Sequence, residues 1–322
     1  MTTTTVSYSE ELVWIESEDE LELAGAVIRP VGRAPRSVAA IWVHGATSRF
    51  YGPAHVQIGR ELAKAGYVFV TGNNRGHLLG ANLLRRGGPQ LGGEQLLGGT
   101  LWERFEESPR DIGAWVTFTM GLGVQDVVLI GHSYGGVKIV YYQAQRQDPR
   151  VVGLVLASPG PIDLLRLREP DLMEDAQRLV AEGRGSELLP PQSDGQPRSS
   201  AQTYLDRTTA VIDVFGAETS NPAIAQVSGP VLAFYGTRED QATAAAALER
   251  IRRQVAGGRV ETRLIEGAVH SYLRTESAVA SAIAEWMDTA LTAAESNTPA
   301  KARVESDRAP VADAKSREAA DA

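Results

Sequence analysis

The residues best suited to do chemistry form a run of five, Gly-His-Ser-Tyr-Gly at 131–135, between an apolar stretch at 126–130 and an amphipathic one. Gly-x-Ser-x-Gly between a strand and a helix predicts a sharp turn, because the glycines leave room for a strained backbone. Such a turn holds a serine hydroxyl up at the carboxyl end of a sheet. A plain strand-to-helix turn is the alternative interpretation, but the flanking pattern favours Ser133 as a nucleophile.

A serine hydroxyl is a poor nucleophile at neutral pH, so it needs a base within hydrogen-bond reach and a carboxylate that orients the base. His270 is the only histidine that follows Ser133 in the chain. It lies just after an expected strand at 260–265 and before the last expected helix. This position predicts His270 as the base rather than as a surface or helix-capping residue.

Two carboxylates, Glu239 and Asp240, compete for the orienting role. Both follow the expected strand at 231–235, after a turn that begins at Gly236. The spacing from that glycine slightly favours Glu239, whereas aspartate is the commoner acid in such triads. The acid that does not orient His270 would cap the following helix, where a negative charge is stabilising.

These residues need a scaffold, and the chain alternates between strand and helix patterns. Strands are expected at 12–17, 21–29, 38–44, 67–71, 126–130, 151–157, 231–235 and 260–265, and helices at 55–65, 111–118, 137–145, 171–181, 241–255 and 272–290. The first two strands predict a hairpin. The rest predicts an α/β fold with a mostly parallel eight-stranded sheet and helices on both faces.

Three segments depart from this alternation. The glycine-rich stretch 76–99 shows no clear element and is expected to be a functional or mobile loop. An insertion at about 161–227 is expected to form a cap on the main domain, 1–292, although a long crossover with helical turns is an alternative. Residues 293–322 are rich in alanine and charge, which predicts a disordered tail.

Composition excludes several functions. The chain of 322 residues contains no cysteine, so a thiolate nucleophile, a disulfide scaffold and a cysteine metal site are ruled out. The net charge of -8 argues against nucleic acid and against anionic membranes as partners. The first residues lack the pattern of a secretory signal, and no apolar run is long enough for a membrane span, so a cytoplasmic protein is expected. The composition leaves open whether the protein forms a homodimer.

Together the motifs resemble those of the α/β-hydrolase superfamily. The matching residues are His44-Gly45, the turn Asn-Arg-Gly-His at 74–77, the run 131–135, the turn 236–240, and His270. The resemblance implies the α/β-hydrolase fold and a triad in the chain order serine, acid, histidine. It also implies an oxyanion hole built from two backbone N–H groups, assigned to Tyr134 and Ala46.

Two details qualify the resemblance. Asn73 and Asn74 stand where the superfamily has an aspartate at the start of the 74–77 turn, which leaves the hydrogen bonding of that loop open. The run 102–107, with Asp111, is similar to a subgroup of bacterial and fungal hydrolases that includes siderophore esterases.

Candidate substrate contacts are His44, Thr47, His77 and Trp102. For His77 a structural role in its turn competes with this interpretation, and Trp102 could equally pack a helix on the sheet. The predicted activity is that of a serine hydrolase that cleaves a small-molecule ester, thioester or lactone through an acyl-enzyme, without a metal or organic cofactor. The alternatives are an acyltransferase or cyclase that uses the same triad, and a non-catalytic ligand-binding protein on this fold.

Overall fold

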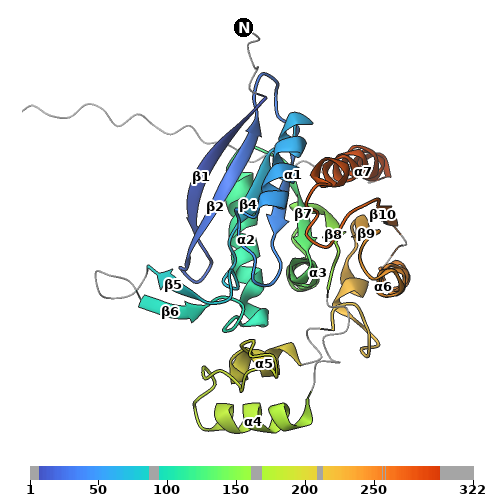
Figure 1. The fold of residues 1–322 in the computed structure, drawn as a ribbon. Helices are drawn as coiled ribbons and strands as arrows, with labels where there is room; N and C mark the ends of the chain where they lie inside the picture. Colours follow the sequence, from blue (N-terminus) through green and yellow to red (C-terminus); the bar gives the residue numbers. More distant parts are fainter. Residues whose placement is uncertain are drawn as a thin grey trace, which may run out of the picture.

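The computed structural model describes residues 7–86, 94–160, 169–208, 213–255, 257 and 259–297. Its centre is one eight-stranded sheet with the strand order β1-β2-β4-β3-β7-β8-β9-β10 (Figure 1). The strands are β1 (Tyr8–Glu16), β2 (Glu22–Pro30), β3 (Val38–Val43), β4 (Phe69–Gly72), β7 (Asp126–His132), β8 (Val151–Ala157), β9 (Val231–Gly236) and β10 (Val260–Ile265). β1 and β2 form an antiparallel hairpin and β2 pairs antiparallel with β4, whereas β3, β4 and β7–β10 are parallel. The predicted fold class is confirmed.

The main helices are α1 (Pro53–Lys64), α2 (Ser108–Met120), α3 (Tyr134–Arg146), α6 (Gln241–Gln254) and α7 (Glu276–Asn297). Successive side chains of a strand point to opposite faces, and β7 shows this clearly. Val127 and Leu129 belong to the apolar core shared with α2, α3 and α6. Val128 and Ile130 belong to the core shared with α1 and α7, which pack against each other. The sheet is therefore covered on both faces.

Two expectations about element boundaries are wrong. The last helix does not begin at 272, because Tyr272 and Arg274 have φ angles of 59° and 69°, which a right-handed helix does not accept. It begins at Glu276 and runs to Asn297, into the expected tail, while residues 298–322 lie outside the described part. The glycine-rich stretch contains a separate antiparallel pair, β5 (Ala81–Arg85) and β6 (Glu94–Gly98).

The described residues of the expected insertion, 169–208 and 213–227, form α4 (Pro170–Ala181) and α5 (Ala201–Arg207) between β8 and β9. They pack on each other around an apolar cluster of their own, which consists of Leu172, Ala176, Leu179, Leu189, Ala201 and Tyr204. Figure 1 shows both helices beyond one end of the sheet, apart from the layers that cover its faces. Short helical turns lie at Phe105–Glu107 and Ala223–Gln226. None of the described helices has the length and apolar character that crossing a membrane requires.

Candidate active site

Ser133 lies at the sharp turn between β7 and α3. Its φ and ψ angles are 53° and -123°, a strained conformation for a residue with a side chain. The flanking glycines are required by packing. A Cβ atom on Gly131 would lie 2.5 Å from the carbonyl oxygen of Gly135, and one on Gly135 would lie 2.1 Å from that of Val43. The Gly-x-Ser-x-Gly pattern is thus explained by contacts that leave no room for a methyl group.

His270 and Glu239 are joined by a hydrogen bond. Nδ1 of His270 lies 2.7 Å from Oε2 of Glu239, and the glutamate side chain is 11% exposed while the imidazole is 52% exposed. Asp240 turns away to cap α6, where it accepts hydrogen bonds from the backbone N–H groups of Ala242 and Thr243. The structure therefore brings Glu239, and not Asp240, to the imidazole.

The carboxylate of Glu239 is held in its ionised form. Burial by itself would raise its pKa, but hydrogen bonds from His270, from the Ser158 hydroxyl and from the Gly236 N–H outweigh this effect and lower the pKa. An ionised carboxylate can only accept hydrogen bonds, so His270 must carry its proton on Nδ1. Nε2 of a neutral imidazole is then an acceptor, which is the form that a general base requires.

Ser133, Glu239 and His270 line one cavity of about 340 Å³. The rest of its wall comes from the ends of β8 and β9 and the start of α6, namely Ser158, Pro159, Gly160, Tyr235, Asp240, Thr243 and Ala244. Among the hydrogen bonds of the described residues, none joins the Ser133 hydroxyl to His270. Catalytic hydrogen bonds are often long in unliganded enzymes and shorten when substrate binds.

The loop after β3 packs directly against the turn that carries Ser133. A Cβ atom on Gly45 would lie 2.9 Å from Cβ of Ser133, so only a glycine allows this approach. Thr47 has a φ angle of 57°, and its N–H donates to the Thr100 hydroxyl at 2.7 Å. Tyr134 is the first residue of α3, whose first-turn N–H groups have no acceptor within the helix. Ala46 lies in the loop between Gly45 and Thr47.

A match to a protein-family model identifies the family of this chain. The model of the Alpha/beta hydrolase family matches residues 40–282, a span that contains Ser133, Glu239 and His270. The chain belongs to the alpha/beta hydrolase family. No curated protein matches the sequence.

Solved structures share the fold of this alpha/beta hydrolase. Est1E from Butyrivibrio proteoclasticus, with ferulic acid bound, has a TM-score of 0.62 at 18% identity, covering 87% of this chain and 99% of that chain. A thermostable carboxyl esterase from Bacillus coagulans, in complex with glycerol, has a TM-score of 0.61 at 13% identity, covering 89% and 100%. Dienelactone hydrolase from Anabaena variabilis has a TM-score of 0.51 at 18% identity, covering 88% and 98%.

Among the predicted substrate contacts, His44 is wrong. Its side chain is fully buried, with Nδ1 2.8 Å from the carbonyl oxygen of Gly45 and Nε2 accepting from the N–H of Asn74 at 3.2 Å. Burial lowers its pKa well below the usual value. Both ring nitrogens of this neutral histidine are used by backbone, so His44 ties the loop after β3 to the 74–77 turn of the alpha/beta hydrolase.

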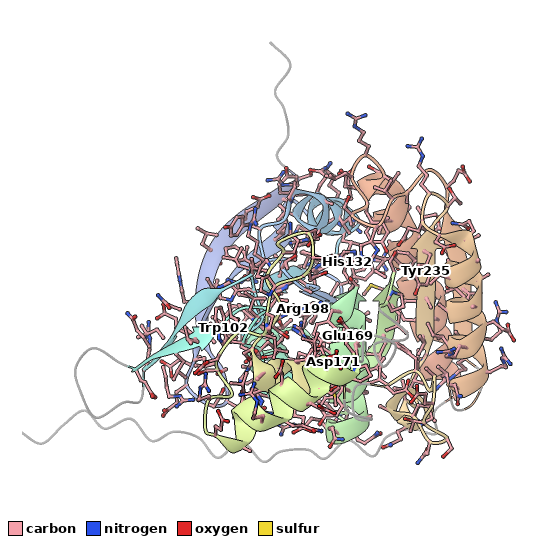
Figure 2. All side chains as sticks on the ribbon, turned by 60° about the horizontal axis from the view of Figure 1, so that its bottom comes forward. Trp102, His132, Glu169, Asp171, Arg198 and Tyr235 are labelled. Atoms are coloured by element: carbon pink, nitrogen blue, oxygen red, sulfur yellow. The ribbon has the colours of Figure 1, made fainter. Side chains whose placement is uncertain are left out.

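Two of the other predicted contacts, His77 and Trp102, have structural partners. The ring of His77 lies against its own turn, with Nδ1 3.0 Å from the carbonyl oxygen of Asn74. Trp102 donates from Nε1 to the carbonyl oxygen of Ser186 at 2.8 Å and so joins the main domain to the insertion. Thr47 is exposed. Figure 2 views the molecule from the end where the insertion lies and shows Trp102 at the edge of this region.

The hydrogen bonding of the 74–77 turn, which the sequence left open, is complete. Asn73 accepts the backbone N–H of Phe50 at 2.9 Å, and Asn74 accepts both the N–H of Gly76 and Nζ of Lys138 at 3.0 Å. Lys138, from α3, is fully buried and forms an ion pair with buried Glu103. Burial lowers the pKa of Lys138 in spite of this partner. Asn74 therefore accepts hydrogen bonds as the usual aspartate would, but it does not add a second buried carboxylate beside Lys138.

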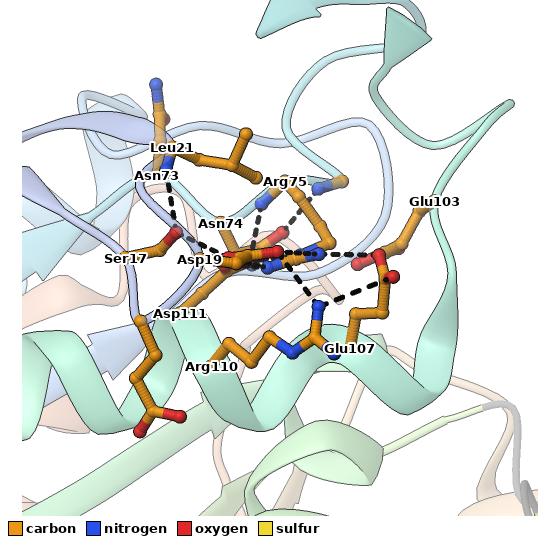
Figure 3. A network of polar contacts seen from close by, with 12 residues as sticks. Ser17, Asp19, Leu21, Asn73, Asn74, Arg75, Glu103, Glu107, Arg110 and Asp111 are labelled. Carbon is orange, nitrogen blue, oxygen red and sulfur yellow. Dashed lines mark hydrogen bonds and ion pairs between the residues drawn. The ribbon is translucent and has the colours of Figure 1, made fainter. Parts of the chain in front are cut away.

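Arg75 anchors the same turn through three carboxylates. Its buried guanidinium contacts Asp111 and Asp19 at 2.8 and 2.9 Å and Glu107 at 2.5 Å (Figure 3). Asp111 also accepts the backbone N–H of Arg75 at 2.8 Å. Three carboxylates of the stretch 102–111 are thus paired with buried cations, Glu103 with Lys138 and Glu107 and Asp111 with Arg75.

Sequence reasoning missed His132, Ser158 and Tyr272. Nε2–H of His132 donates to the carbonyl oxygen of His270 at 2.8 Å, and burial is the main effect that lowers the pKa of His132 to about 4. Its place in the Gly-His-Ser-Tyr-Gly run was the only available signal. Ser158 and Tyr272 carried none, because their contacts join distant parts of the chain. Within the described residues no group of three or more His, Asp or Glu side chains could hold a metal ion.

Proposed function

We propose that this protein is a serine hydrolase that cleaves a small-molecule carboxylic ester, thioester or lactone through a Ser133–His270–Glu239 triad. The observation that carries the proposal is the hydrogen bond of 2.7 Å between His270 and the partly buried Glu239, in the cavity that Ser133 also lines. A base oriented by an ionised carboxylate beside a serine on a strained turn is the arrangement that acyl transfer requires.

In the first half of the reaction, Nε2 of His270 takes the proton of the Ser133 hydroxyl while the oxygen attacks the substrate carbonyl carbon. The tetrahedral oxyanion is stabilised by the N–H groups of Ala46 and Tyr134, and such preorganised donors contribute several kcal/mol. His270 then gives its proton to the leaving group, and the acyl group stays on Ser133. Glu239 stabilises the imidazolium that forms in between.

In the second half, a water molecule replaces the leaving group. His270 takes a proton from this water, the hydroxide attacks the acyl carbon, and a second tetrahedral intermediate forms at the same N–H groups. Its collapse releases the acid and returns the proton to the Ser133 oxygen. All proton transfers pass through His270, so no metal or organic cofactor enters the cycle.

Two observations support an ester of modest size. The cavity of about 340 Å³ is in the range of small-molecule sites. Solved structures of the same fold include proteins named as a carboxyl esterase and as a dienelactone hydrolase, so the fold accommodates both ester and lactone cleavage.

The test is Ser133→Ala, assayed with p-nitrophenyl acetate and butyrate, a short thioester and a γ-lactone. We expect kcat to fall by about 10⁴–10⁶-fold, because residues that act as a unit lose nearly all chemistry together. A fluorophosphonate probe should add to the wild-type protein once, and peptide mapping should place the adduct on Ser133.

Ser228→Ala is the matched control, since Ser228 is an exposed serine in the segment before β9. It should keep wild-type turnover and wild-type labelling. The proposal is wrong if Ser133→Ala retains full hydrolysis, or if the probe still labels that variant.

A further inference from the structure

Behind Glu239 lies a hydrogen-bonded pair that the proposed mechanism does not use. The hydroxyl of Ser158, at the end of β8, donates to Oε1 of Glu239 at 2.6 Å. The same hydroxyl oxygen lies 2.5 Å from the phenol oxygen of Tyr272. The backbone N–H of Gly236 donates to Oε1 of Glu239 at 2.7 Å. Both oxygens of the carboxylate are thus occupied, Oε2 by His270 and Oε1 by this second set.

The direction of these hydrogen bonds follows from counting protons. A hydroxyl has one proton to donate, and Ser158 gives it to the ionised carboxylate of Glu239. The hydrogen bond between Ser158 and Tyr272 therefore requires the phenol to be the donor. Burial raises the pKa of Tyr272 well above its usual value, so the phenol keeps its proton over the whole working range of pH. The chain of donors runs from Tyr272 through Ser158 to Glu239.

This series of hydrogen bonds leads back to the segment that carries His270. Tyr272 follows His270 by two residues, and its N–H donates to the carbonyl oxygen of Val269 at 2.9 Å. The segment that carries the base is therefore tied to the carboxylate twice, directly through the imidazole and indirectly through Tyr272 and Ser158. Both side chains are buried, with relative exposures of 0% for Ser158 and 1% for Tyr272.

Backbone strain is also present at these residues. Ser133, Ser158 and Tyr272 have φ angles of 53°, 43° and 59°, in the region that residues with side chains rarely adopt. Strained residues persist only where the surrounding structure holds them, and they cluster at functional sites. In this protein the nucleophile shares that property with the two residues that hold Glu239.

We propose that Ser158 and Tyr272 are positioning residues, which fix the second oxygen of Glu239 and the loop of His270 so that the Glu239–His270 pair is formed before substrate binds. The proposal rests on the proposed function, because it assigns a task to residues behind the same site. Neither residue reacts with the substrate. Their contribution is to hold the Glu239–His270 pair in one geometry, so it should appear in the rate of acylation of Ser133 rather than in substrate affinity.

The experiment compares Ser158→Ala and Tyr272→Phe with the wild-type protein, each removing one hydroxyl. We expect kcat for p-nitrophenyl butyrate to fall by about 10–100-fold, the usual loss when a residue that orients a catalytic group is removed, while KM stays within about 2-fold. The double variant should lose little more than either single one, since the two hydroxyls act in series. Circular dichroism should show that all three fold.

A second arm asks whether the effect passes through Glu239. In a Glu239→Gln background, Ser158→Ala should change the rate of fluorophosphonate labelling of Ser133 by less than about 2-fold, because the group that Ser158 positions is already altered. A merely structural role for Ser158 would give the same loss in both backgrounds, and that result would overturn the proposal.

The chain offers matched controls for both substitutions. The Ser17 hydroxyl also donates to a carboxylate at 2.6 Å, that of Asp19, and the buried Tyr142 phenol donates to Asp148 at 2.5 Å. Ser17→Ala and Tyr142→Phe should leave kcat unchanged. If Ser158→Ala and Tyr272→Phe keep wild-type kcat while Ser133→Ala is inactive, this proposal is wrong and the serine hydrolase stands. If Ser133→Ala is fully active, the proposed function itself fails.

Discussion

Oε2 of Glu239 lies 2.7 Å from Nδ1 of His270, while the neighbouring carboxylate of Asp240 caps α6. Glu239 and Asp240 are adjacent in the sequence, and the turn that begins at Gly236 determines which of them reaches His270. The backbone N–H of Gly236 donates to Glu239, and this fixes the side chain toward β8 and the His270 loop. Asp240 is then the next residue, in the extended conformation of a helix N-cap.

This division of labour predicts that Glu239→Gln and Asp240→Asn differ sharply. Glutamine cannot stabilise the imidazolium and favours the wrong tautomer of His270, so kcat should fall by about 10²–10⁴-fold. Asparagine caps a helix as well as aspartate does, so Asp240→Asn should keep kcat within about 2-fold. Steady-state rates with p-nitrophenyl butyrate check both. Equal losses in the two variants would contradict the assignment of Glu239.

Gly45 offers a test of the loop that approaches the nucleophile. In Gly45→Ala the added methyl group would meet Cβ of Ser133 and the carbonyl oxygen of His132, each at 2.9 Å, so the loop carrying Ala46 must move. A displaced oxyanion donor costs about 10²–10³-fold in kcat. Gly229→Ala is the control, because its methyl group would make only ordinary contacts, the nearest at 3.6 Å. Wild-type kcat in Gly45→Ala would show that this loop does not set the geometry of the reaction.

How much of this site the sequence could predict depends on how local each signal is. Ser133 and its glycines form one short run, and the alternation of strands and helices places that run at the end of a buried strand. His270 could be found because no other histidine follows Ser133. The sequence limits the orienting acid to Glu239 or Asp240, and only the geometry of the turn distinguishes between these two candidates.

The residues that were missed or misjudged depend on contacts between distant parts of the chain. Ser158 contacts Tyr272 across 114 positions, and no periodic pattern records such a pair. His44 is next to Gly45 at the end of β3, but its side chain contacts the N–H of Asn74 in the 74–77 turn and its exposure is zero. The antiparallel pair of β5 and β6 escaped notice because neither strand, Ala-Asn-Leu-Leu-Arg nor Glu-Gln-Leu-Leu-Gly, alternates apolar and polar residues.

The Arg75 cluster is expected to stabilise the fold. Asp111 is fully buried and pairs with Arg75, so Asp111→Ala leaves a buried guanidinium with weaker compensation from Asp19 and Glu107. Urea unfolding should show a loss of about 3 kcal/mol. Glu107→Ala removes a partner that is 36% exposed, and should cost less than about 1 kcal/mol because water screens that pair. Equal losses in the two variants would mean that burial of the partner does not decide the energy.

Two histidines whose pKa is lowered predict how the free energy of unfolding depends on pH. Burial lowers the pKa of both His55 and His132 to about 4, whereas an unfolded chain holds histidine near 6.5. As the pH falls below about 6.5, the unfolded state binds protons that the folded state does not. The contribution of these two neutral histidines to the free energy of unfolding is therefore fully present above pH 6.5, and it is lost as the pH falls toward 4. The slope is about 1.4 kcal/mol per pH unit for each histidine.

His55→Gln should flatten the pH dependence of the free energy of unfolding by about that slope between pH 6 and 4.5, measured by urea unfolding at constant ionic strength. Thr71→Val is the matched control. The Thr71 hydroxyl donates to the carbonyl oxygen of Phe50 at 2.9 Å, and Nε2 of His55 contacts the same oxygen at 2.9 Å. Thr71→Val should lower stability at every pH without changing the slope, because it removes a hydrogen bond but no titrating group. An unchanged slope in His55→Gln would mean that His55 is charged in the folded protein.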